Sequence, residues 1–292
     1  MNFAGLEAEN IDHEGALFEV LPVPYDLTST YQAGSRRGPI AILEASAQVE
    51  LYDDELRRET WKAGIITRPF LEIDARGPEY MVRKVREEVA ATLSRDKIPV
   101  VLGGEHSITL GAVQAVKERY SNLSVLQLDA HADLRDTYQE TPFSHACVGR
   151  RILEICPLVQ AGIRNLAGEE ADFIAVNHGI LSLSAEETLQ PGWIERIRDG
   201  LTDDVYITID LDAFDPSIMP STGTPEPGGL SWADVLSLVR TVSASKRIRG
   251  FDVVELCPIP GLPAPDFMAA KLVYRVMGYI VTSRLSGKGE VH

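Results

Sequence analysis

The stretch "LSVLQLDAHAD", residues 123–133, joins an apolar run to three regularly spaced polar side chains. Its first half, up to Leu128, is typical of a strand buried on both faces, as in parallel sheets. Asp129, His131 and Asp133 then follow at alternate positions, and these residue types bind cations. The pattern predicts a buried strand that ends in candidate metal ligands, although an ordinary polar turn would also account for it.

Similar apolar runs recur along the chain, with helical patterns between them. Residues 78–95, 107–118 and 231–243 have apolar positions three and four apart, which is the period of a helix. Ser231 is a candidate N-cap for the last of these helices. The other predicted strands cover residues 16–23, 98–104, 157–163, 205–212 and 248–256. This alternation predicts an α/β fold whose parallel sheet is covered by helices on both faces.

Length and composition are those of one globular domain. The chain has 292 residues, 45% of them apolar and 24% charged, which suits a single large α/β sheet. We predict one domain over residues 1–292, with about 1–14 and 286–292 peripheral to its core. The beginning of the chain does not resemble a signal peptide, no apolar run is long enough for a membrane span, and the three cysteines lack metal-finger spacing. We therefore expect a cytoplasmic protein without a membrane partner.

The charge is strongly acidic, with 28 Lys and Arg against 43 Asp and Glu and a formal net charge of −15. Nucleic acid is therefore an unexpected partner, because phosphate binding requires a basic surface. A small cationic substrate would be attracted by such a field. Solubility alone would explain the charge equally well.

More polar side chains follow other predicted strands, and the carboxyl ends of parallel strands meet at one edge of a sheet. The candidate ligands that this edge would collect are His106, Asp129, His131, Asp133, Asp210 and Asp212. Four carboxylates would repel one another unless cations lay between them, so two divalent ions are the simplest account. Mixed imidazole and carboxylate ligands suit Mn²⁺, with Zn²⁺ or Fe²⁺ as alternatives. Bridging carboxylates would hold the ions about 3.5–4 Å apart, where both can polarise one water.

Other polar residues carry weaker signals. Glu105 precedes a candidate ligand and is expected to support it, and Asp215 before Pro216 is typical of a turn. His145, in "PFSHACVGRR", has no ligand neighbours and by itself would be an ordinary capping or surface residue. The remaining histidines, for which we expect structural roles, are His13, His178 and His292.

Five motifs together resemble those of the ureohydrolases, the arginase and agmatinase family, and their sequences are most similar to those of agmatinases. They are "LGGEHS" (102–107), "DAHADLRD" (129–136), "TIDLDAFDP" (208–216), "TGTPEPGGL" (222–230) and "GFDVVELCP" (250–258). With "VPYDLTSTYQAGSRRGPIAI" (23–42), the resemblance covers almost the whole chain. It departs from the family at Glu105, where many members have Asp, and at Thr208, where Ser is common. Neither departure removes a ligand.

The resemblance implies a three-layer α/β/α sandwich with a mainly parallel eight-stranded sheet, assembled as homotrimers or homohexamers. It also implies two Mn²⁺ ions per chain, with Asp129 and Asp210 as bridging ligands. Glu255 would pair with the substrate guanidinium, Asp133 would accept a proton, and His145 would contact the substrate and carry protons to and from solvent. The ligands would be His106, Asp129, Asp133 and Asp210 for one ion, and Asp129, His131, Asp210 and Asp212 for the other.

We expect hydrolysis of a guanidino compound, with agmatine cleaved to putrescine and urea. Alternatives are N1-aminopropylagmatine cleaved to spermidine, guanidinobutyrate, arginine and formiminoglutamate. An arginase would need acidic groups near the substrate α-amine, and the matching positions hold Asn165 and Ala167. Asp136 and Glu140 would attract a free ammonium group. From other classes, a dinuclear phosphoesterase would need more cations than Arg135, a deacetylase would use a single zinc, and an idle polyamine-binding regulator should have lost ligands.

Overall fold

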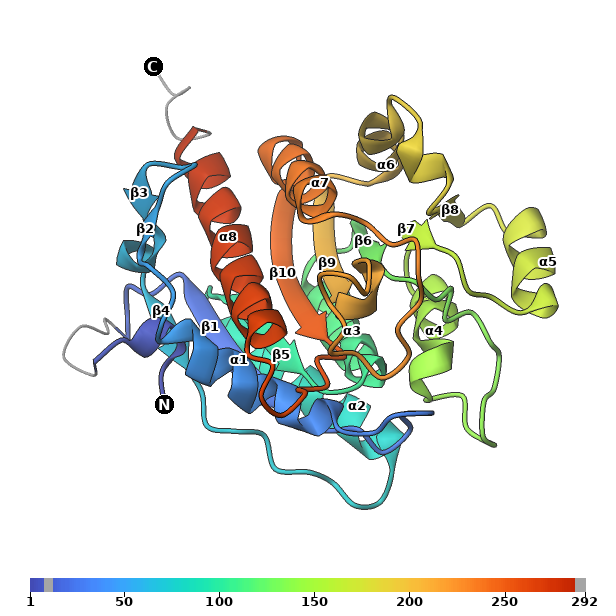
Figure 1. Cartoon of the computed structure of the whole chain (residues 1–292), viewed down its shortest axis with the longest axis horizontal. Helices are drawn as coiled ribbons and strands as arrows, with labels where there is room; N and C mark the ends of the chain where they lie inside the picture. Colours follow the sequence, from blue (N-terminus) through green and yellow to red (C-terminus); the bar gives the residue numbers. More distant parts are fainter. Residues whose placement is uncertain (8–12, 287–292) are drawn as a thin grey trace.

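An eight-stranded sheet forms the centre of the computed structural model, which describes residues 1–7 and 13–286 (Figure 1). Each neighbouring pair of strands in it is parallel. In spatial order the strands are β4 (Ile65–Thr67), β1 (Phe18–Val23), β5 (Ile98–Gly103), β10 (Arg247–Val254), β9 (Asp204–Asp210), β6 (Leu123–Leu128), β7 (Leu158–Ile163) and β8 (Ile180–Ser184).

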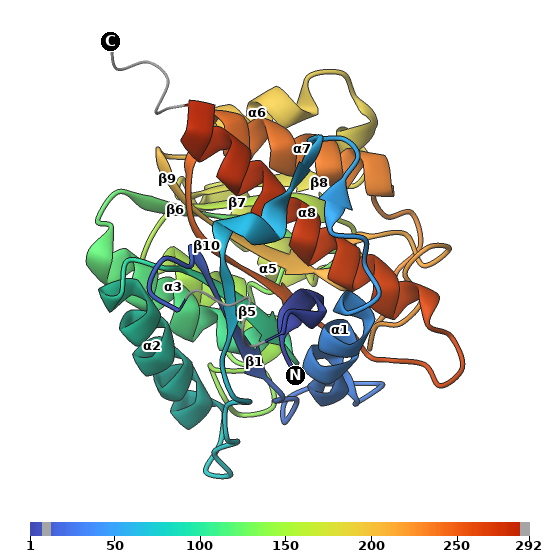
Figure 2. The same ribbon diagram turned by 90° about the vertical axis from the view of Figure 1, so that its left-hand side faces the viewer.

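Helices cover both faces of the sheet, which confirms the predicted three-layer α/β/α architecture (Figure 2). One layer contains α1 (Gly38–Ser46), α6 (Trp193–Gly200), α7 (Trp232–Ser245) and α8 (Ala264–Ser286). The other contains α2 (Pro78–Ser94), α3 (Thr109–Arg119), α4 (Val148–Leu153) and α5 (Gly168–Val176). A small antiparallel pair, β2 (Tyr52–Asp53) and β3 (Arg58–Glu59), lies outside the sheet.

The six strands predicted from apolar runs are all present, and so are the three helices. Ser231 caps α7, because its Oγ accepts a hydrogen bond from the Asp234 amide at 3.2 Å. Besides the small pair β2 and β3, the strands that we did not predict are β4 and β8, one at each edge of the main sheet. Strand β4 has three residues and β8 is mostly half-buried, so neither forms a long apolar run. No helix within 1–7 and 13–286 is both long and apolar enough to cross a membrane.

The beginning of the chain is not wholly peripheral, contrary to our expectation for residues 1–14. Phe3 and Leu6 are buried in the same core cluster as α1 and α8. The Phe3 amide also donates to Thr67 Oγ1 at 2.8 Å, which joins this segment to β4. At the other end, Ser286 is exposed at the end of α8, and residues 287–292 lie outside the described part of the chain.

Four adjacent central strands, β5, β10, β9 and β6, place the polar motifs side by side at their carboxyl ends. A close crossing of loops fixes the first of these ends. A Cβ at Gly104 would lie 2.0 Å from the carbonyl oxygen of Tyr25, so this position requires glycine. The amides of Gly104 and Glu105 donate to the carbonyls of Val23 and Tyr25 at 2.9 and 2.7 Å. The loop after β1 is thereby held against the end of β5.

Candidate metal centre

His106 lies at the middle of three carboxylates. Its Nδ1 atom is 3.2 Å from Asp129 Oδ2, 3.2 Å from Asp133 Oδ2 and 3.4 Å from Asp210 Oδ2. The imidazole and these carboxylates are almost completely buried. Residues from the ends of β5, β6 and β9 therefore converge, as the order of the strands requires.

His131 lies at the middle of a second, overlapping group. Its Nδ1 atom is 2.9 Å from Asp212 Oδ2 and 3.7 Å from Asp129 Oδ1. His106, Asp129 and Asp210 could hold one cation, and Asp129, His131 and Asp212 could hold another. Because Asp129 belongs to both groups, the structure is consistent with two neighbouring ions that share a carboxylate ligand.

Hydrogen bonds fix the orientation of these carboxylates. The Asp212 amide donates to Asp210 Oδ1 at 2.9 Å, and the Ala130 amide donates to Asp212 Oδ1 at 3.1 Å. Asp129 accepts from the His131 amide and from Gln127 Nε2, both at 2.7 Å. For Asp210 and Asp212, the second oxygen is the one that faces a histidine. Fixed ligands of this kind are a requirement of a preorganised cation site.

The electrostatics also favour bound cations. Burial and then the Asp129 charge raise the pKa of Asp133, while burial, Asp212 and Asp129 raise the pKa of Asp210. Nδ1 of His106 is buried and has no well-aligned hydrogen-bond partner in the described part of the chain. Divalent cations would neutralise the carboxylates and use the imidazole lone pair at once. The donor set therefore fits the predicted pair of metal ions.

A buried polar chain behind His106 sets the tautomer of this histidine. Thr208 Oγ1 lies 2.8 Å from His106 Nε2, and its own hydroxyl donates to Asp252 Oδ1 at 2.6 Å. Tyr206 donates to the other oxygen of Asp252 at 2.9 Å. Since the Thr208 hydrogen is directed at Asp252, the threonine oxygen accepts the Nε2 hydrogen of His106. Nδ1 then presents its lone pair to the carboxylate cluster.

His145 lies beside the cluster and is held by the loop after β1. Its amide donates to Thr28 Oγ1 at 3.0 Å, and its Nδ1 lies 3.3 Å from the same oxygen. Thr28 is in turn held by the buried Glu105, which accepts from the Thr28 amide at 2.5 Å and from its hydroxyl at 2.7 Å. Burial is the main cause that lowers the pKa of His145, to about 4. His145 is therefore a neutral imidazole at neutral pH.

Glu255 follows β10 with a backbone φ of 64°, in the left-handed region that non-glycine residues seldom occupy. Its amide donates to the Gly104 carbonyl at 2.7 Å, and its Oε1 accepts from the His106 amide at 2.7 Å. Asp133 has a similar φ of 53°. Backbone strain of this kind is found at functional sites where the surrounding structure enforces it.

Two neighbouring hollows, which share several lining residues, lie at the cluster. The inner one measures about 20 Å³, room for roughly one water molecule, and includes Asp133, His145, Asp210 and Glu255 in its lining. The outer one measures about 250 Å³. It shares His131, Asp133 and His145 with the inner hollow and is lined further out by Tyr138, Asn165, Leu166 and Ala167. A long, narrow substrate could place one end in the cluster and the rest in the outer hollow.

Not every predicted side chain reaches these hollows. Asp136 is paired with Arg151 at 2.5 Å, Glu140 is exposed, and neither residue lines either hollow. Their positions therefore do not fit the role that we predicted for them, which was to attract the ammonium group of the substrate. Asp215 organises a turn by accepting the amides of Ser217, Gly228 and Gly229. His13 and His178 are exposed, while His292 lies outside the described residues.

Sequence reasoning missed the polar groups that support the site. Thr28 and Thr30 contact His145, and Gln127 and Asp252 support the candidate ligands. A signal existed for the last two, because each is a polar residue inside an otherwise apolar predicted strand. No comparable signal marks the threonines.

The fold and the donor set define a hydrolase with a candidate two-metal centre at the carboxyl edge of a parallel sheet, and comparisons with known proteins agree. The model of the arginase family matches residues 16–278. An N(1)-aminopropylagmatine ureohydrolase from Synechocystis is 40% identical over 94% of this chain and 92% of its own length. An agmatinase from Pyrococcus horikoshii is 33% identical over 94% and 95%.

A solved structure is also similar: the agmatine ureohydrolase of Thermoplasma volcanium superimposes with a TM-score of 0.85 at 30% identity, covering 100% of this chain and 97% of that one. The chain belongs to the arginase family. It is a ureohydrolase, an enzyme that hydrolyses guanidino compounds.

Proposed function

We propose that the substrate is N1-aminopropylagmatine, which is hydrolysed to spermidine and urea with the aid of two Mn²⁺ ions. The observation that carries this proposal is the 40% identity to the Synechocystis aminopropylagmatine ureohydrolase, against 33% to the Pyrococcus agmatinase. This order of the two substrates differs from our reading of the sequence, which put agmatine first. Both substrates are cationic and suit an acidic chain.

The shape of the site supports a long polyamine. The guanidinium group would lie at the metal cluster, and the aminopropyl arm would occupy the outer hollow of about 250 Å³. Asn165 and Ala167 line that outer hollow, at the positions where an arginase would carry acidic groups. An α-amino acid substrate would therefore lack its partner there.

Agmatine is the second candidate. The specific observation in its favour is the similarity to the Thermoplasma volcanium structure, an agmatine ureohydrolase. The shorter substrate would extend from the metal cluster toward the outer hollow, but it would leave the space of the aminopropyl arm to water. The two candidates differ in what the outer hollow contributes to binding, and this difference can be measured.

For the mechanism, we propose that the metal ligands are His106, Asp129, His131, Asp133, Asp210 and Asp212. Bound divalent ions at such a site supply a water molecule of lowered pKa and stabilise developing charge. Glu255 orients the guanidinium, because a carboxylate forms strong charge-assisted hydrogen bonds with a planar cation that has several donors. One of its oxygens is occupied by the His106 amide, which leaves Oε2 for the substrate.

Two groups move protons in this proposal. Asp133 lines the inner hollow and accepts a proton from the attacking water. His145 lines both hollows, so its imidazole can pass protons between the leaving amine and solvent. Thr28 and Thr30 hold the two nitrogens of this imidazole at 3.3 and 3.5 Å and orient the ring.

The deciding experiment compares kcat/KM of the Mn²⁺-loaded enzyme for aminopropylagmatine, agmatine, guanidinobutyrate, arginine and formiminoglutamate by urea or formamide release. We expect aminopropylagmatine to exceed agmatine at least tenfold. An advantage for agmatine of the same size would establish the second candidate. Arginine or guanidinobutyrate in first place would contradict both, because it would show that a substrate carboxylate is recognised.

We further propose that the enzyme acts in polyamine synthesis in the cytoplasm as a homotrimer or homohexamer, without nucleic acid or membrane partners. These proposals follow the family resemblance and the acidic charge of the chain. Light scattering coupled to gel filtration would measure the molar mass, and a monomer at micromolar concentration would contradict the assembly.

A further inference from the structure

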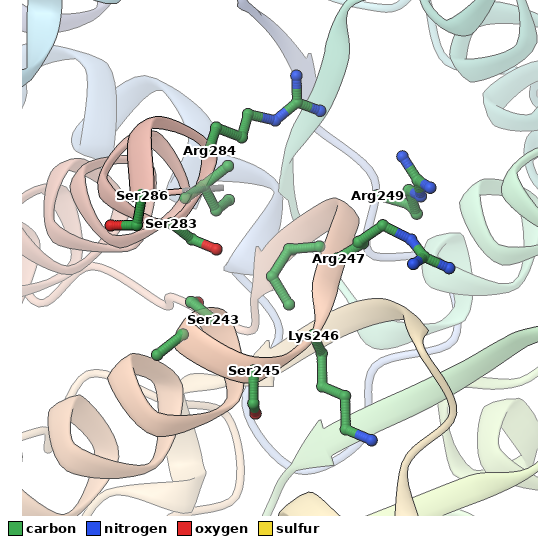
Figure 3. Close-up of a pocket in the computed structure, with 11 residues that line it drawn as sticks. Ser243, Ser245, Lys246, Arg247, Arg249, Ser283, Arg284 and Ser286 are labelled. Atoms are coloured by element: carbon green, nitrogen blue, oxygen red, sulfur yellow. The ribbon is translucent and has the colours of Figure 1, made fainter. Parts of the chain in front are cut away.

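A basic hollow lies at the amino ends of the strands, opposite the carboxyl ends that carry the candidate metal centre. It measures about 550 Å³ and is formed by the end of α7, the first residues of β10 and the end of α8 (Figure 3). Lys246, Arg247, Arg249 and Arg284 all line it. Four cations around one hollow contrast with the net charge of −15 of the whole chain.

Carboxylates balance only part of this charge. Arg247 and Arg249 both donate through Nε to Asp204 Oδ1, at 3.0 and 2.6 Å. The Arg249 guanidinium also packs on the ring of Tyr120 at 4.1 Å, which fixes its plane. Lys246 points away from the three guanidinium groups in Figure 3 and donates to the Leu201 carbonyl at 2.7 Å.

Arg284 is the cation that remains unbalanced. It forms no ion pair with a carboxylate in the part of the chain that the structure describes, and Figure 3 shows its side chain extending from α8 toward the side of the view where Arg249 lies. Ser243, which also lines the hollow, is 1% exposed, and its hydroxyl has no hydrogen-bond partner among the described residues.

We propose that this hollow binds a small molecule through a phosphate group. A guanidinium presents paired N–H donors that match two phosphate oxygens, and Arg249 and Arg284 would approach the group from two sides. The hollow is larger than a phosphate ion, so it has room for the organic part of a phosphate ester. Neither the resemblance nor the proposed reaction uses these residues.

The hollow is remote from the reaction. Strand β9 runs from Asp204, which anchors Arg247 and Arg249, to Asp210 of the metal cluster. At roughly 3.3 Å per residue, the two sites lie about 20 Å apart. A ligand in the hollow would therefore not block the substrate directly, and binding can be tested without reference to the substrate.

A simpler explanation is that the cations only complement their surroundings. Helices α7 and α8 both end at the hollow, and cations are favourable near the negative ends of helix dipoles. Asp203 and Asp204 would account for Arg247 and Arg249 in the same way. This explanation predicts no affinity for anions, so a binding measurement separates it from our proposal.

The test is isothermal titration of the Mn²⁺-loaded full chain, freed of excess metal, with inorganic phosphate and with adenosine monophosphate at low ionic strength. We expect both to bind, and Arg284→Gln to weaken each at least tenfold. Arg284 is exposed and holds no ion pair with the described residues, so this variant should fold normally. Arg196→Gln is the matched control, because it removes an exposed arginine paired with Glu187 away from the hollow.

Two outcomes would overturn the proposal. If the wild type binds neither anion, the cations serve only the helix ends and the aspartates. If it binds them and Arg284→Gln binds equally well, the anion lies elsewhere, for example at the metal centre. Arg249→Gln provides a second check, with thermal unfolding as the measure of whether that variant is folded, because it also removes a contact with Asp204.

Discussion

Thr208 Oγ1 lies 2.8 Å from Nε2 of His106, and the threonine hydroxyl donates onward to Asp252. The family resemblance marked Thr208 only as a departure from the commoner serine. In the structure its hydroxyl holds one nitrogen of a candidate ligand, so that the other nitrogen faces three carboxylates. Either hydroxyl residue could serve here, which explains why the departure leaves the site intact.

Thr208→Val should weaken metal binding about 10- to 100-fold, the usual effect of removing a group that orients a metal ligand. Valine has nearly the same shape but cannot accept the His106 hydrogen. Thr208→Ser is the matched control and should bind metal like the wild type. Titration of the apoprotein with Mn²⁺ measures both, and equal affinities for the Val and Ser variants would contradict a positioning role for the hydroxyl.

Removing the metal should abolish urea release and lower the melting temperature. Without cations the buried carboxylates repel one another, and ions that bind only the folded chain stabilise it by about 2.7 kcal/mol at 100 times their Kd. We expect Mn²⁺ to raise the Tm of chelator-treated protein by about 5 °C. Mg²⁺ at the same concentration should do less, because imidazole ligands disfavour it.

Elemental analysis of the active protein should find about two Mn²⁺ per chain, as expected of a two-metal hydrolytic site. One tightly held zinc per chain would contradict the dinuclear assignment. An equal rise in Tm with Mg²⁺ and Mn²⁺ would show that the stabilisation comes from screening of charge and not from the predicted ligands.

His145→Gln should keep both metals and reduce kcat by roughly 10²–10⁴, the usual contribution of general acid–base catalysis. Glutamine retains a polar group near Thr28 but cannot exchange a proton at neutral pH. Metal analysis of the variant is the control, because loss of metal would reduce activity for another reason. If the kcat of the variant equals that of the wild type between pH 6 and 8, His145 has a structural role.

The same variant should change the acid sensitivity of the fold. Burial lowers the pKa of His145 from about 6.5 to about 4, so below pH 6.5 the unfolded chain binds a proton that the folded chain does not. His145 therefore makes stability fall as the pH decreases from about 6.5 to about 4. Urea unfolding at pH 7 and pH 5 should show a smaller loss for His145→Gln, and an equal loss would contradict the direction of the shift.

Ala167→Phe should discriminate between the two candidate substrates. Ala167 lines the outer hollow, where the longer substrate needs the additional space of its aminopropyl arm. The variant should lose kcat/KM for aminopropylagmatine at least tenfold, and keep most of its activity on agmatine. Ala175→Phe places the same ring on an exposed position of α5 and should leave both unchanged. Equal losses for both substrates with Ala167→Phe would place the aminopropyl arm elsewhere.

The sequence was sufficient to predict the six inner strands and the convergence of the candidate ligands, for one physical reason. Strands buried on both faces are apolar along most of their length, so an aspartate such as Asp129 or Asp210 at the end of one is conspicuous. The edge strands β4 and β8 are short or half-buried and lack this pattern. Their existence was implied only by the family resemblance.

The support around His145 could not be predicted, because it depends on contacts between distant parts of the chain. Thr28 is 77 residues from Glu105 and 117 from His145. Local patterns carry no information about such pairs. The same reason explains why Asp136 and Glu140, next to the site in sequence, lie outside the hollows in the structure.

The candidate ligands and the lining of the outer hollow come from different parts of the architecture. The ligands follow the central strands, whereas Tyr138, Asn165 and Ala167 lie in loops that follow β6 and β7. A mutation, insertion or exchange in those loops can alter which molecule fits while the hydrolytic groups keep their geometry. During evolution, duplicated genes for this fold could therefore acquire new guanidino substrates in small steps, each of which still yields an active enzyme.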